Sequence, residues 1–189
     1  MLKTEHRLLI NQLHLRKATY DDLDDIMRFE TRGFSPGNQE ERSVYEERIA
    51  TFAEGAWISE YDRKPVGCIF SEIWCTRDML TSNDFELGHS SSNRHDPVYG
   101  TELYISSMTI DPIYRGQKFG FQLFNGCIQR VSMRYPQINS ALLLVNEHWV
   151  QAHDIYKASK FHEVMRVSQF FVPYPDVYED GIVMRKKLT

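Results

Sequence analysis

The sequence has few of the features that mark secreted, metal-binding or membrane-spanning proteins. Its 189 residues include three cysteines, and none of them forms a C-x-x-C pair or lies at zinc-binding spacing from a histidine. This sparse count fits a reducing compartment and predicts no bound metal. The longest uninterrupted apolar run is "ALLLV" at 141–145, far below the ~20 residues that a membrane-spanning helix needs. The N-terminal stretch also lacks the apolar core of a signal peptide, so a cytoplasmic protein is expected.

Basic charge is not in excess either. Lysine and arginine total 22 against 26 aspartate and glutamate residues, which gives a net charge of −4. A nucleic-acid partner usually requires a basic face, and a membrane protein requires a long apolar segment, so neither partner is expected. The length and the 42% hydrophobic content predict one domain across residues 1–189 with a sizeable core. Whether the chain forms a homodimer stays open.

Hydrophobic periodicity and turn residues predict alternating strands and helices. Helices are predicted at 20–33, 39–53, 120–135 and 149–159, and strands at 13–19, 56–61, 66–74, 101–110, 139–145, 161–172 and 181–188. Two further stretches predict loops, namely the long polar segment 75–100 and the segment 173–180 between the last two strands. This order of elements is typical of an α/β or α+β domain.

The stretch "DPIYRGQKFGFQLF" at 111–124 places two glycines and two cations where a strand gives way to a helix. Arg115 and Lys118 oppose the helix dipole unless an anion lies between them. Free N–H groups in the first helical turn, with glycines that let an anion approach the backbone, make a phosphate site. The Walker and dinucleotide patterns are absent, because Gly116 and Gly120 give only G-x-x-x-G. The pyrophosphate of coenzyme A is the remaining common ligand, and a plain glycine turn is the alternative.

This stretch resembles the coenzyme-binding signature of the GNAT acetyltransferase family, which reads Arg or Gln, two residues, Gly, one residue, then Gly or Ala. Arg115 and Gly120 match its ends, while Lys118 stands where the middle glycine is usual. Upstream, "SSMTIDPIYRG" is similar to the strand and turn that precede the signature in that family.

A second stretch, "LLLVNEHWVQAHDIYKASKFHEV", resembles the other signature of the same family. Ala152, Tyr156 and Phe161 fit it, whereas Trp149 replaces an Asn and Lys160 replaces a Gly. The resemblance covers about residues 14–187, which form the expected core of the domain. It implies a single domain whose central sheet is mixed and mostly antiparallel, with six to seven strands and about four flanking helices.

The resemblance also implies that acetyl-CoA is the co-substrate and that the activity is N-acetyl transfer to a primary amine. It assigns the thioester carbonyl to the N–H of Met108 and the pantetheine arm to Thr109 and Ile110. Tyr156 falls on the tyrosine that protonates the leaving thiolate, since a phenol is a suitable acid for a thiolate. The implied coenzyme-binding set is Met108, Thr109, Ile110, Arg115, Gly116, Gln117, Lys118, Phe119 and Gly120.

Such a reaction needs a base, because an alkylamine with a pKa of about 10.4 arrives mostly protonated. Glu102 and Tyr104 alternate along the predicted strand 101–110, so they share a face of the sheet and are the candidate proton acceptors. With Ser106 they could pass a proton to water. A water chain without a single base is the alternative.

The acceptor site in that family lies between the first two helices and the loop that joins the last two strands. Here these segments supply Phe29, Glu30, Phe34 and Tyr174 as candidate substrate-binding residues. Aromatic rings beside carboxylates suit a cation with an apolar body, which favours a small-molecule amine. The alternatives are a peptide or protein N-terminus as acceptor, a non-catalytic acyl-CoA-binding module, and a nucleotide binder unrelated to coenzyme A.

A narrower resemblance concerns the arylalkylamine N-acetyltransferases. The run "GCIFSEIWCTRDML", the loop "GHSSSNRHDP" and the strand that follows are similar to that group. The two strand histidines of those enzymes fall on Tyr104 and Ser106, so their imidazole relay is missing here.

Overall fold

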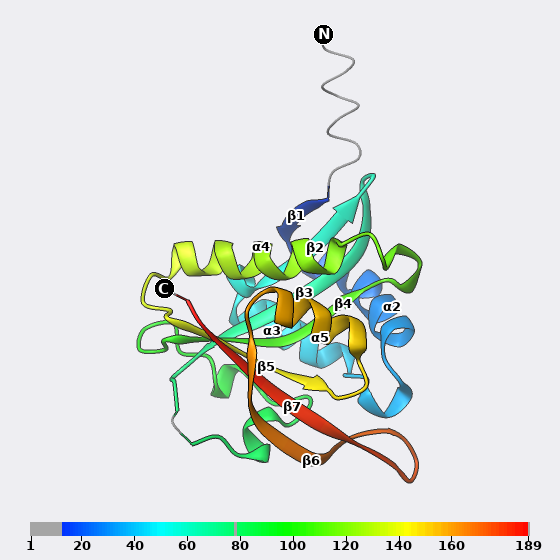
Figure 1. Cartoon of the computed structure of the whole chain (residues 1–189). Helices are drawn as coiled ribbons and strands as arrows, with labels where there is room; N and C mark the ends of the chain where they lie inside the picture. Colours follow the sequence, from blue (N-terminus) through cyan, green and yellow to red (C-terminus); the bar gives the residue numbers. More distant parts are fainter. Residues whose placement is uncertain (1–12, 78, 189) are drawn as a thin grey trace.

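A computed structural model describes residues 13–77 and 79–188 (Figure 1). Its strands and α-helices are His14–Lys17 (β1), Leu23–Gly33 (α2), Arg42–Thr51 (α3), Ala56–Tyr61 (β2), Lys64–Trp74 (β3), Glu102–Ile110 (β4), Phe119–Arg134 (α4), Ser140–Asn146 (β5), Val150–Ala158 (α5), His162–Tyr174 (β6) and Val177–Lys187 (β7). These bounds agree with the sequence-based elements except in the last hairpin. Within the predicted polar loop 75–100, the described residues include two short 3-10 helices, Ser82–Phe85 and Ser91–Asn93.

The predicted loop 173–180 is wrong. Strands β6 and β7 run through most of it and pair as far as Tyr174 with Val177, which leaves a two-residue turn at Pro175 and Asp176. Asp176 has φ 62°, and aspartate is one of the residues that tolerate this left-handed conformation in a turn. The tyrosines and valines that flank the turn favour extended backbone. A paired hairpin therefore replaces the expected loop between the last two strands.

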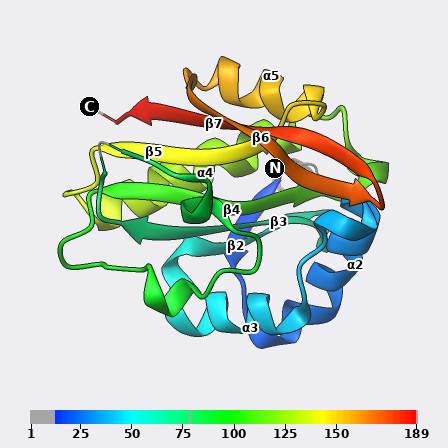
Figure 2. The ribbon, with the colours of Figure 1, turned by 90° about the horizontal axis from the view of Figure 1, so that it is seen from below.

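All seven described strands form one sheet in the order β1-β2-β3-β4-β5-β7-β6 (Figure 1). Within it, β4 and β5 form a parallel pair, and the other neighbours are antiparallel. Figure 2 shows α2 and α3 at one edge of the view and α5 at the opposite edge, with strands between them. The predicted mixed, mostly antiparallel sheet with about four helices is confirmed.

Two apolar clusters fix the helices to the sheet. Helices α2 and α3 pack Phe29, Tyr45 and Ile49 against β2 and β3. Helices α4 and α5 contribute to the larger cluster, in which Leu123 and Tyr156 join residues from β3, β4 and β5. Each helix packs against the sheet by burying one apolar stripe of its side chains.

The parallel pair β4–β5 comes apart halfway along β4. Its register runs from Glu102 opposite Ser140 to Ile105 opposite Leu143 and then stops, although both strands continue. At the same place the β3–β4 register shifts by one residue, so β4 carries a bulge at Ser106. A bulge bends a strand and breaks its pairing. The second half of β4 therefore has backbone groups that β5 does not pair, and the functional cavity opens there.

Candidate active site

A cavity of about 960 Å³ lies along the unpaired half of β4. This volume is near the upper end of the ~300–1,000 Å³ range of small-molecule and cofactor sites. The end of α2, the segment before α3, the first turn of α4, helix α5 and strand β6 complete its wall. The predicted site residues that line it are Glu30, Phe34, Tyr104, Met108, Thr109, Ile110, Arg115, Gly116, Lys118, Phe119, Gly120 and Tyr156. Gln117 belongs to the same turn but is absent from the lining residues.

The turn between β4 and α4 is held in place from both sides. Asp111 caps the short helix Pro112–Tyr114 by accepting a hydrogen bond from the Ile113 N–H at 3.2 Å. The other oxygen of Asp111 accepts from Arg32 of α2 at 2.8 Å. Arg115 donates from Nε to the Ile110 carbonyl at 3.2 Å, and its guanidinium nitrogens stay beside the cavity. The turn therefore presents its cations next to the free N–H groups of the α4 N-terminus.

The backbone explains both lysines that replace signature glycines. Lys118 has φ 63° and Lys160 has φ 70°, so both adopt the left-handed conformation that glycine accommodates without strain. The lysines accept this strain while keeping the path of the chain. Glycine at position 120 is explained by packing instead, because a Cβ there would lie 2.8 Å from the Ile155 Cδ1 atom of α5.

The α2 side of the cavity carries a buried carboxylate with an unusual pKa. Glu30 is 2% exposed. Its two oxygens accept hydrogen bonds from the Tyr45 hydroxyl at 2.6 Å and from the Glu40 N–H at 2.8 Å. The Tyr45 hydroxyl also lies 3.4 Å from the Ser107 hydroxyl of β4. Burial raises the pKa of Glu30 to about 7, against the opposing effect of these two hydrogen bonds.

A second carboxylate stands next to Glu30 but is already paired. Arg48 of α3 contacts both oxygens of Glu40, at 2.5 and 2.8 Å. Burial alone would raise the pKa of Glu40, but the Arg48 guanidinium outweighs it, and the pKa is lowered. Of these two carboxylates, Glu30 is therefore the one that can change its charge near neutral pH.

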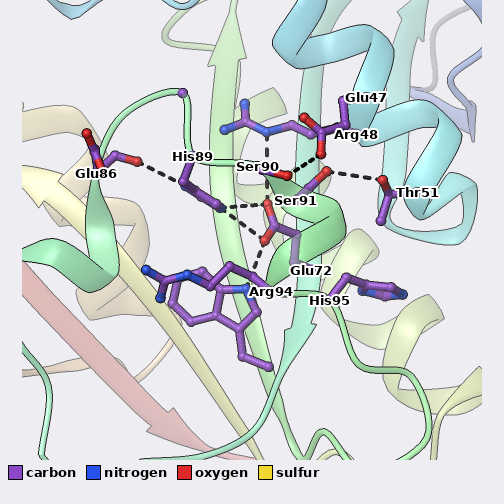
Figure 3. Close-up of polar contacts among 12 residues, drawn as sticks. Glu47, Arg48, Thr51, Glu72, Glu86, His89, Ser90, Ser91, Arg94 and His95 are labelled. Atoms are coloured by element: carbon purple, nitrogen blue, oxygen red, sulfur yellow. Dashed lines mark hydrogen bonds and ion pairs between the residues drawn. The ribbon is translucent and has the colours of Figure 1, made fainter.

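The long polar loop is fastened over this part of the site by buried polar contacts (Figure 3). Figure 3 shows the Glu72 carboxylate of β3 between Arg48 and His89, and the His89 Nε2 atom lies 3.0 Å from Glu72 Oε1. The other ring nitrogen of His89 lies 3.0 Å from the Glu86 carbonyl oxygen. Between these two loop residues, Leu87 lines the cavity.

More hydrogen bonds hold the same loop against α3. The Gly88 N–H donates to Glu40 at 2.9 Å, and the Ser90 hydroxyl donates to Glu47 at 2.7 Å. Ser91 donates to Thr51 at 3.3 Å (Figure 3). These contacts fix the part of the loop around Leu87, the loop residue that lines the cavity.

The two predicted proton acceptors on β4 are separated. Tyr104 lines the cavity, where its ring stacks on Trp74 with centroids 3.8 Å apart, and burial raises the pKa of its hydroxyl. Glu102 lies outside the cavity, on a smaller hollow under the polar loop. Its carboxylate accepts hydrogen bonds from Arg185 at 2.8 and 3.0 Å and from Ser140 at 2.9 Å. The hydrogen bonds from Arg185 and Ser140 hold the Glu102 carboxylate away from the cavity.

The predicted acceptor residues divide in the same way. Phe29 is 0% exposed and belongs to the core between α2 and the sheet, so it cannot contact a ligand. Tyr174 is 54% exposed at the tip of the hairpin and is absent from the cavity wall. Phe34 does line the cavity, and its ring lies 5.2 Å from that of Trp149, which lies 5.3 Å from that of Phe171. These three rings, from the residue after α2, the residue before α5 and strand β6, form an aromatic wall.

Sequence reasoning missed Asn38 and Glu40 of the α2–α3 connection, which also line the cavity. Neither belongs to a signature, and no local pattern marks them. Their neighbour Gly37 packs directly on strand β6, because a Cβ at Gly37 would clash with the Val172 carbonyl oxygen. The α2–α3 connection and the last hairpin therefore meet on this side of the cavity.

Tyr156 completes the site from α5. It lines the cavity, and its ring packs against Phe124 with centroids 4.9 Å apart. Burial raises the pKa of its hydroxyl, so the phenol keeps its proton at neutral pH and can act as a donor. In the part of the chain that the structure describes, no three His, Cys, Asp or Glu side chains gather as metal ligands. No helix there has the length and apolar character of a membrane span.

The sequence matches the acetyltransferase (GNAT) family over residues 20–161. An open sheet whose parallel strands separate over a cavity, with a cation-bearing turn at a helix N-terminus, is the architecture of an acyl-transfer domain, and the chain belongs to the GNAT family. The predicted family, fold and enzyme class are thereby confirmed. A comparison with curated proteins by sequence found no match.

Several solved structures share the fold. The ribosomal-protein-S18-alanine N-acetyltransferase from Escherichia coli is 15% identical at a TM-score of 0.68, with 94% of this chain and 95% of that chain covered. NAA60 from Arabidopsis thaliana, solved with a bisubstrate analogue, is 18% identical at a TM-score of 0.69, with 93% and 98% covered. The GphF GNAT-like decarboxylase in complex with isobutyryl-CoA is 17% identical at a TM-score of 0.74, with 93% and 100% covered. At these identities the likeness shows the fold alone.

Proposed function

We propose that this protein transfers an acetyl group from acetyl-CoA to a small primary amine, with Glu30 as the base and Tyr156 as the acid. The observation that carries the proposal is the division of one cavity into two chemically different ends. Toward the end of β4, Arg115 and Lys118 flank the N-terminus of α4. Three residues back along β4, Ser107 faces the Tyr45–Glu30 pair. One end suits phosphate groups and the other suits an ammonium group.

The coenzyme end fits the pyrophosphate by its backbone. Gly116 has φ 80°, and a Cβ built there meets nothing within 4 Å, so the turn leaves open space for an anion. Residues Met108, Thr109 and Ile110 lie on the half of β4 that β5 does not pair, where backbone groups are free to contact the pantetheine arm and the thioester. The solved GphF neighbour binds isobutyryl-CoA, which supports an acyl-CoA as the ligand.

At the other end, Glu30 is suited to take a proton from the acceptor. With a pKa of about 7, it is partly ionised at neutral pH, where a general base is most effective. Glu30 accepts the proton of the ammonium group, and the free amine then attacks the thioester carbonyl carbon. As the new C–N bond forms, the C–S bond breaks, and Tyr156 donates its proton to the departing thiolate. The nitrogen of the new amide releases its second proton, which returns Tyr156 to its protonated form.

The shape of the acceptor end favours a small amine. The contact of Gly37 with Val172 joins the α2–α3 connection to the hairpin. The aromatic wall of Phe34, Trp149 and Phe171 suits an apolar body attached to the reacting nitrogen. A peptide N-terminus is the second candidate acceptor, because the E. coli neighbour acetylates the alanine of a ribosomal protein.

Calorimetry with acetyl-CoA, with coenzyme A and ATP as controls, tests the first half of the proposal. We expect micromolar binding of acetyl-CoA and none of ATP. A panel of small amines and short peptides, followed by thiol release, tests the second half. Absence of acetyl-CoA binding at millimolar concentration would contradict the coenzyme site. Thiol release with peptides but not with small amines would show that the acceptor is a peptide N-terminus and not a small amine.

A further inference from the structure

Glu30 is placed to hold a proton, but protein groups already engage both of its oxygens. The side chain is buried. One oxygen accepts from the Glu40 N–H at 2.8 Å, and the other accepts from the Tyr45 hydroxyl at 2.6 Å. A proton that reaches Glu30 through Tyr45 would therefore travel along a hydrogen bond that is already in place.

The bulge of β4 turns Ser107 toward this pair. Without the bulge, Ser106 would share a face of the strand with Tyr104, because side chains alternate. The register instead places Ser107 opposite Phe70 of β3, and residues opposite each other in an antiparallel pair share a face. The Phe70 ring lies 5.0 Å from the Tyr45 ring. Ser107 is half-buried and lines the cavity, and its hydroxyl lies 3.4 Å from that of Tyr45. Ser107 therefore joins the cavity wall to Tyr45.

The donors and acceptors of these groups fix the direction of the hydrogen bonds. An ionised carboxylate only accepts hydrogen bonds, so the single proton of Tyr45 is donated to Glu30. The Tyr45 oxygen then accepts from the Ser107 hydroxyl. This leaves the lone pairs of the Ser107 oxygen for a donor in the cavity. The 3.4 Å contact is long for two hydroxyls, and catalytic hydrogen bonds often tighten only when the substrate is bound.

Tyr45 is held in position and keeps its proton. It is fully buried, its ring packs on Phe70, and the Arg48 Cζ atom lies 5.3 Å from its ring centroid. Burial raises the pKa of its hydroxyl well above the usual value, so no tyrosinate forms at neutral pH. The hydroxyl can therefore release one proton only while it receives another.

We infer that Ser107 and Tyr45 relay the proton of the acceptor to Glu30. The ammonium group gives a proton to the Ser107 oxygen, the Ser107 proton passes to the Tyr45 oxygen, and the Tyr45 proton passes to Glu30. Each hydroxyl ends with one proton, Glu30 becomes neutral, and the amine nitrogen keeps the electron pair that attacks the thioester. After the product leaves, Glu30 returns its proton to solvent along the same hydroxyls. The inference rests on the proposed function, and it names amines that are charged at neutral pH as the acceptor class.

Two amines of nearly the same shape separate proton removal from the other steps. Phenethylamine is an ammonium ion at neutral pH, and its ring suits the aromatic wall. O-Benzylhydroxylamine has an oxygen in place of the methylene group next to the nitrogen, which lowers its basicity, so it arrives as the neutral base. Acetyl-CoA-dependent thiol release gives kcat/KM for each amine. Damage to the relay alone should slow the first amine and spare the second.

Two variants interrupt the relay. Ser107→Ala removes its cavity end and leaves the Tyr45–Glu30 contact, whereas Tyr45→Phe removes its middle and keeps the ring. We expect kcat/KM for phenethylamine to fall by roughly 10²-fold in each, the lower end of the usual contribution of proton transfer, and kcat/KM for O-benzylhydroxylamine to change by less than about twofold. Ser132→Ala and Tyr135→Phe are the matched controls, since neither residue is among the described residues of the cavity wall. Binding of acetyl-CoA to each variant verifies that the fold is retained.

A measurement at pH 9 separates the relay from a second effect of Tyr45. Burial raises the pKa of Glu30 to about 7, and the Tyr45 hydrogen bond opposes that shift. Tyr45→Phe should therefore raise this pKa further and weaken the base near neutral pH. That loss disappears at a pH where Glu30 is ionised, whereas the loss of a relay persists. Full recovery of phenethylamine acetylation by Tyr45→Phe at pH 9 would overturn the inference.

The remaining outcomes are distinct. If Glu30→Gln slows phenethylamine but neither hydroxyl variant does, Glu30 takes the proton directly, and the inference is overturned while the proposed function stands. Equal losses with both amines would also overturn it, because a relay acts only on a charged acceptor. If no acetyl-CoA binds and no thiol is released with either amine, the proposed function itself fails.

Discussion

The two ends of the cavity are built from different parts of the chain. The coenzyme end is mostly backbone: a turn with left-handed residues, the first turn of α4 and the unpaired half of β4, all between residues 106 and 121. The acceptor end is mostly side chain: its lining carboxylates, Glu30 and Glu40, come from α2 and the α2–α3 connection and are held by side chains of α3. A backbone site must keep its local sequence pattern, whereas a side-chain site can be assembled from residues that are far apart in sequence.

The largest effect is expected at the acceptor end. Glu30→Gln keeps the shape of the side chain and removes the proton acceptor. We expect kcat/KM for acetyl transfer to fall by roughly 10²–10⁴-fold, the usual contribution of a general base, with binding of acetyl-CoA unchanged. Steady-state thiol release and calorimetry measure the two quantities. Glu41→Gln, an exposed carboxylate outside the cavity, is the matched control. Full activity in Glu30→Gln would leave a water chain as the route for the proton.

Tyr156→Phe removes the proposed acid, which lies between the two ends. The phenyl ring can keep its contact with Phe124, so the loss should be catalytic. We expect kcat to fall by about 10²-fold, while KM for the acceptor changes little. Tyr135→Phe, at the far end of α4, should have no such effect. An unchanged kcat would remove Tyr156 from the mechanism.

His89→Ala tests whether the polar loop belongs to the acceptor end alone. The substitution removes the contact that joins the loop to Glu72 and frees Leu87. We expect KM for the acceptor to rise about tenfold, or ~1.4 kcal/mol, with the Kd of acetyl-CoA unchanged. If KM for the acceptor and the Kd of acetyl-CoA rise together, the acceptor end and the coenzyme end are not independent.

Arg115→Glu tests whether the coenzyme end can be weakened without changing the acceptor end. Reversing the charge beside the α4 N-terminus should weaken acetyl-CoA binding by about tenfold, and the loss should shrink at high salt because ions screen exposed charges. KM for the acceptor should not change. Arg134→Glu, at the other end of the same helix, changes the net charge equally and serves as control. Unchanged binding of acetyl-CoA in Arg115→Glu would place the phosphates elsewhere.

The smallest effect concerns the strain in the coenzyme turn. Lys118→Gly relieves a left-handed lysine, which should stabilise the fold by about 1 kcal/mol and raise Tm by about 2–4 °C for a chain of this length. Lys160→Gly, with φ 70° at the end of α5, should give a similar gain. Only the Lys118 variant should weaken acetyl-CoA binding, by less than about threefold because one exposed charge is lost. A lower Tm for these variants would show that the left-handed lysines do not strain the fold.

The same contrast explains what the sequence could predict. The coenzyme turn was recognisable because Arg115, Gly116 and Gly120 lie in one short stretch of the sequence, and the cavity wall contains all three. Strand and helix positions followed from periodicity, since each element buries one face. Tyr156 was recognisable for the same reason, as part of a contiguous signature on one helix.

The acceptor end was less predictable because tertiary packing creates it. Alternation along β4 placed Glu102 and Tyr104 on one face of the strand, but only the fold shows that Glu102 is buried and bound to Arg185 of β7. Burial raises the pKa of Glu30, and the hydrogen bond from Tyr45, fifteen positions away, partly opposes that shift. Glu40 gave no signal at all, because its partner Arg48 becomes visible only in the fold.

The pH dependence of kcat/KM for the unmodified protein and for Glu30→Gln, measured with one amine from pH 5 to pH 9, tests the central claim most directly. In the unmodified protein Glu30 must be deprotonated to take the proton of the ammonium group, so kcat/KM should rise about tenfold per pH unit below the pKa of about 7 and then level off. In Glu30→Gln the amine must lose its proton to solvent, so kcat/KM should keep rising about tenfold per pH unit toward the amine pKa of about 10.4. Two profiles of the same shape would show that Glu30 does not take the proton.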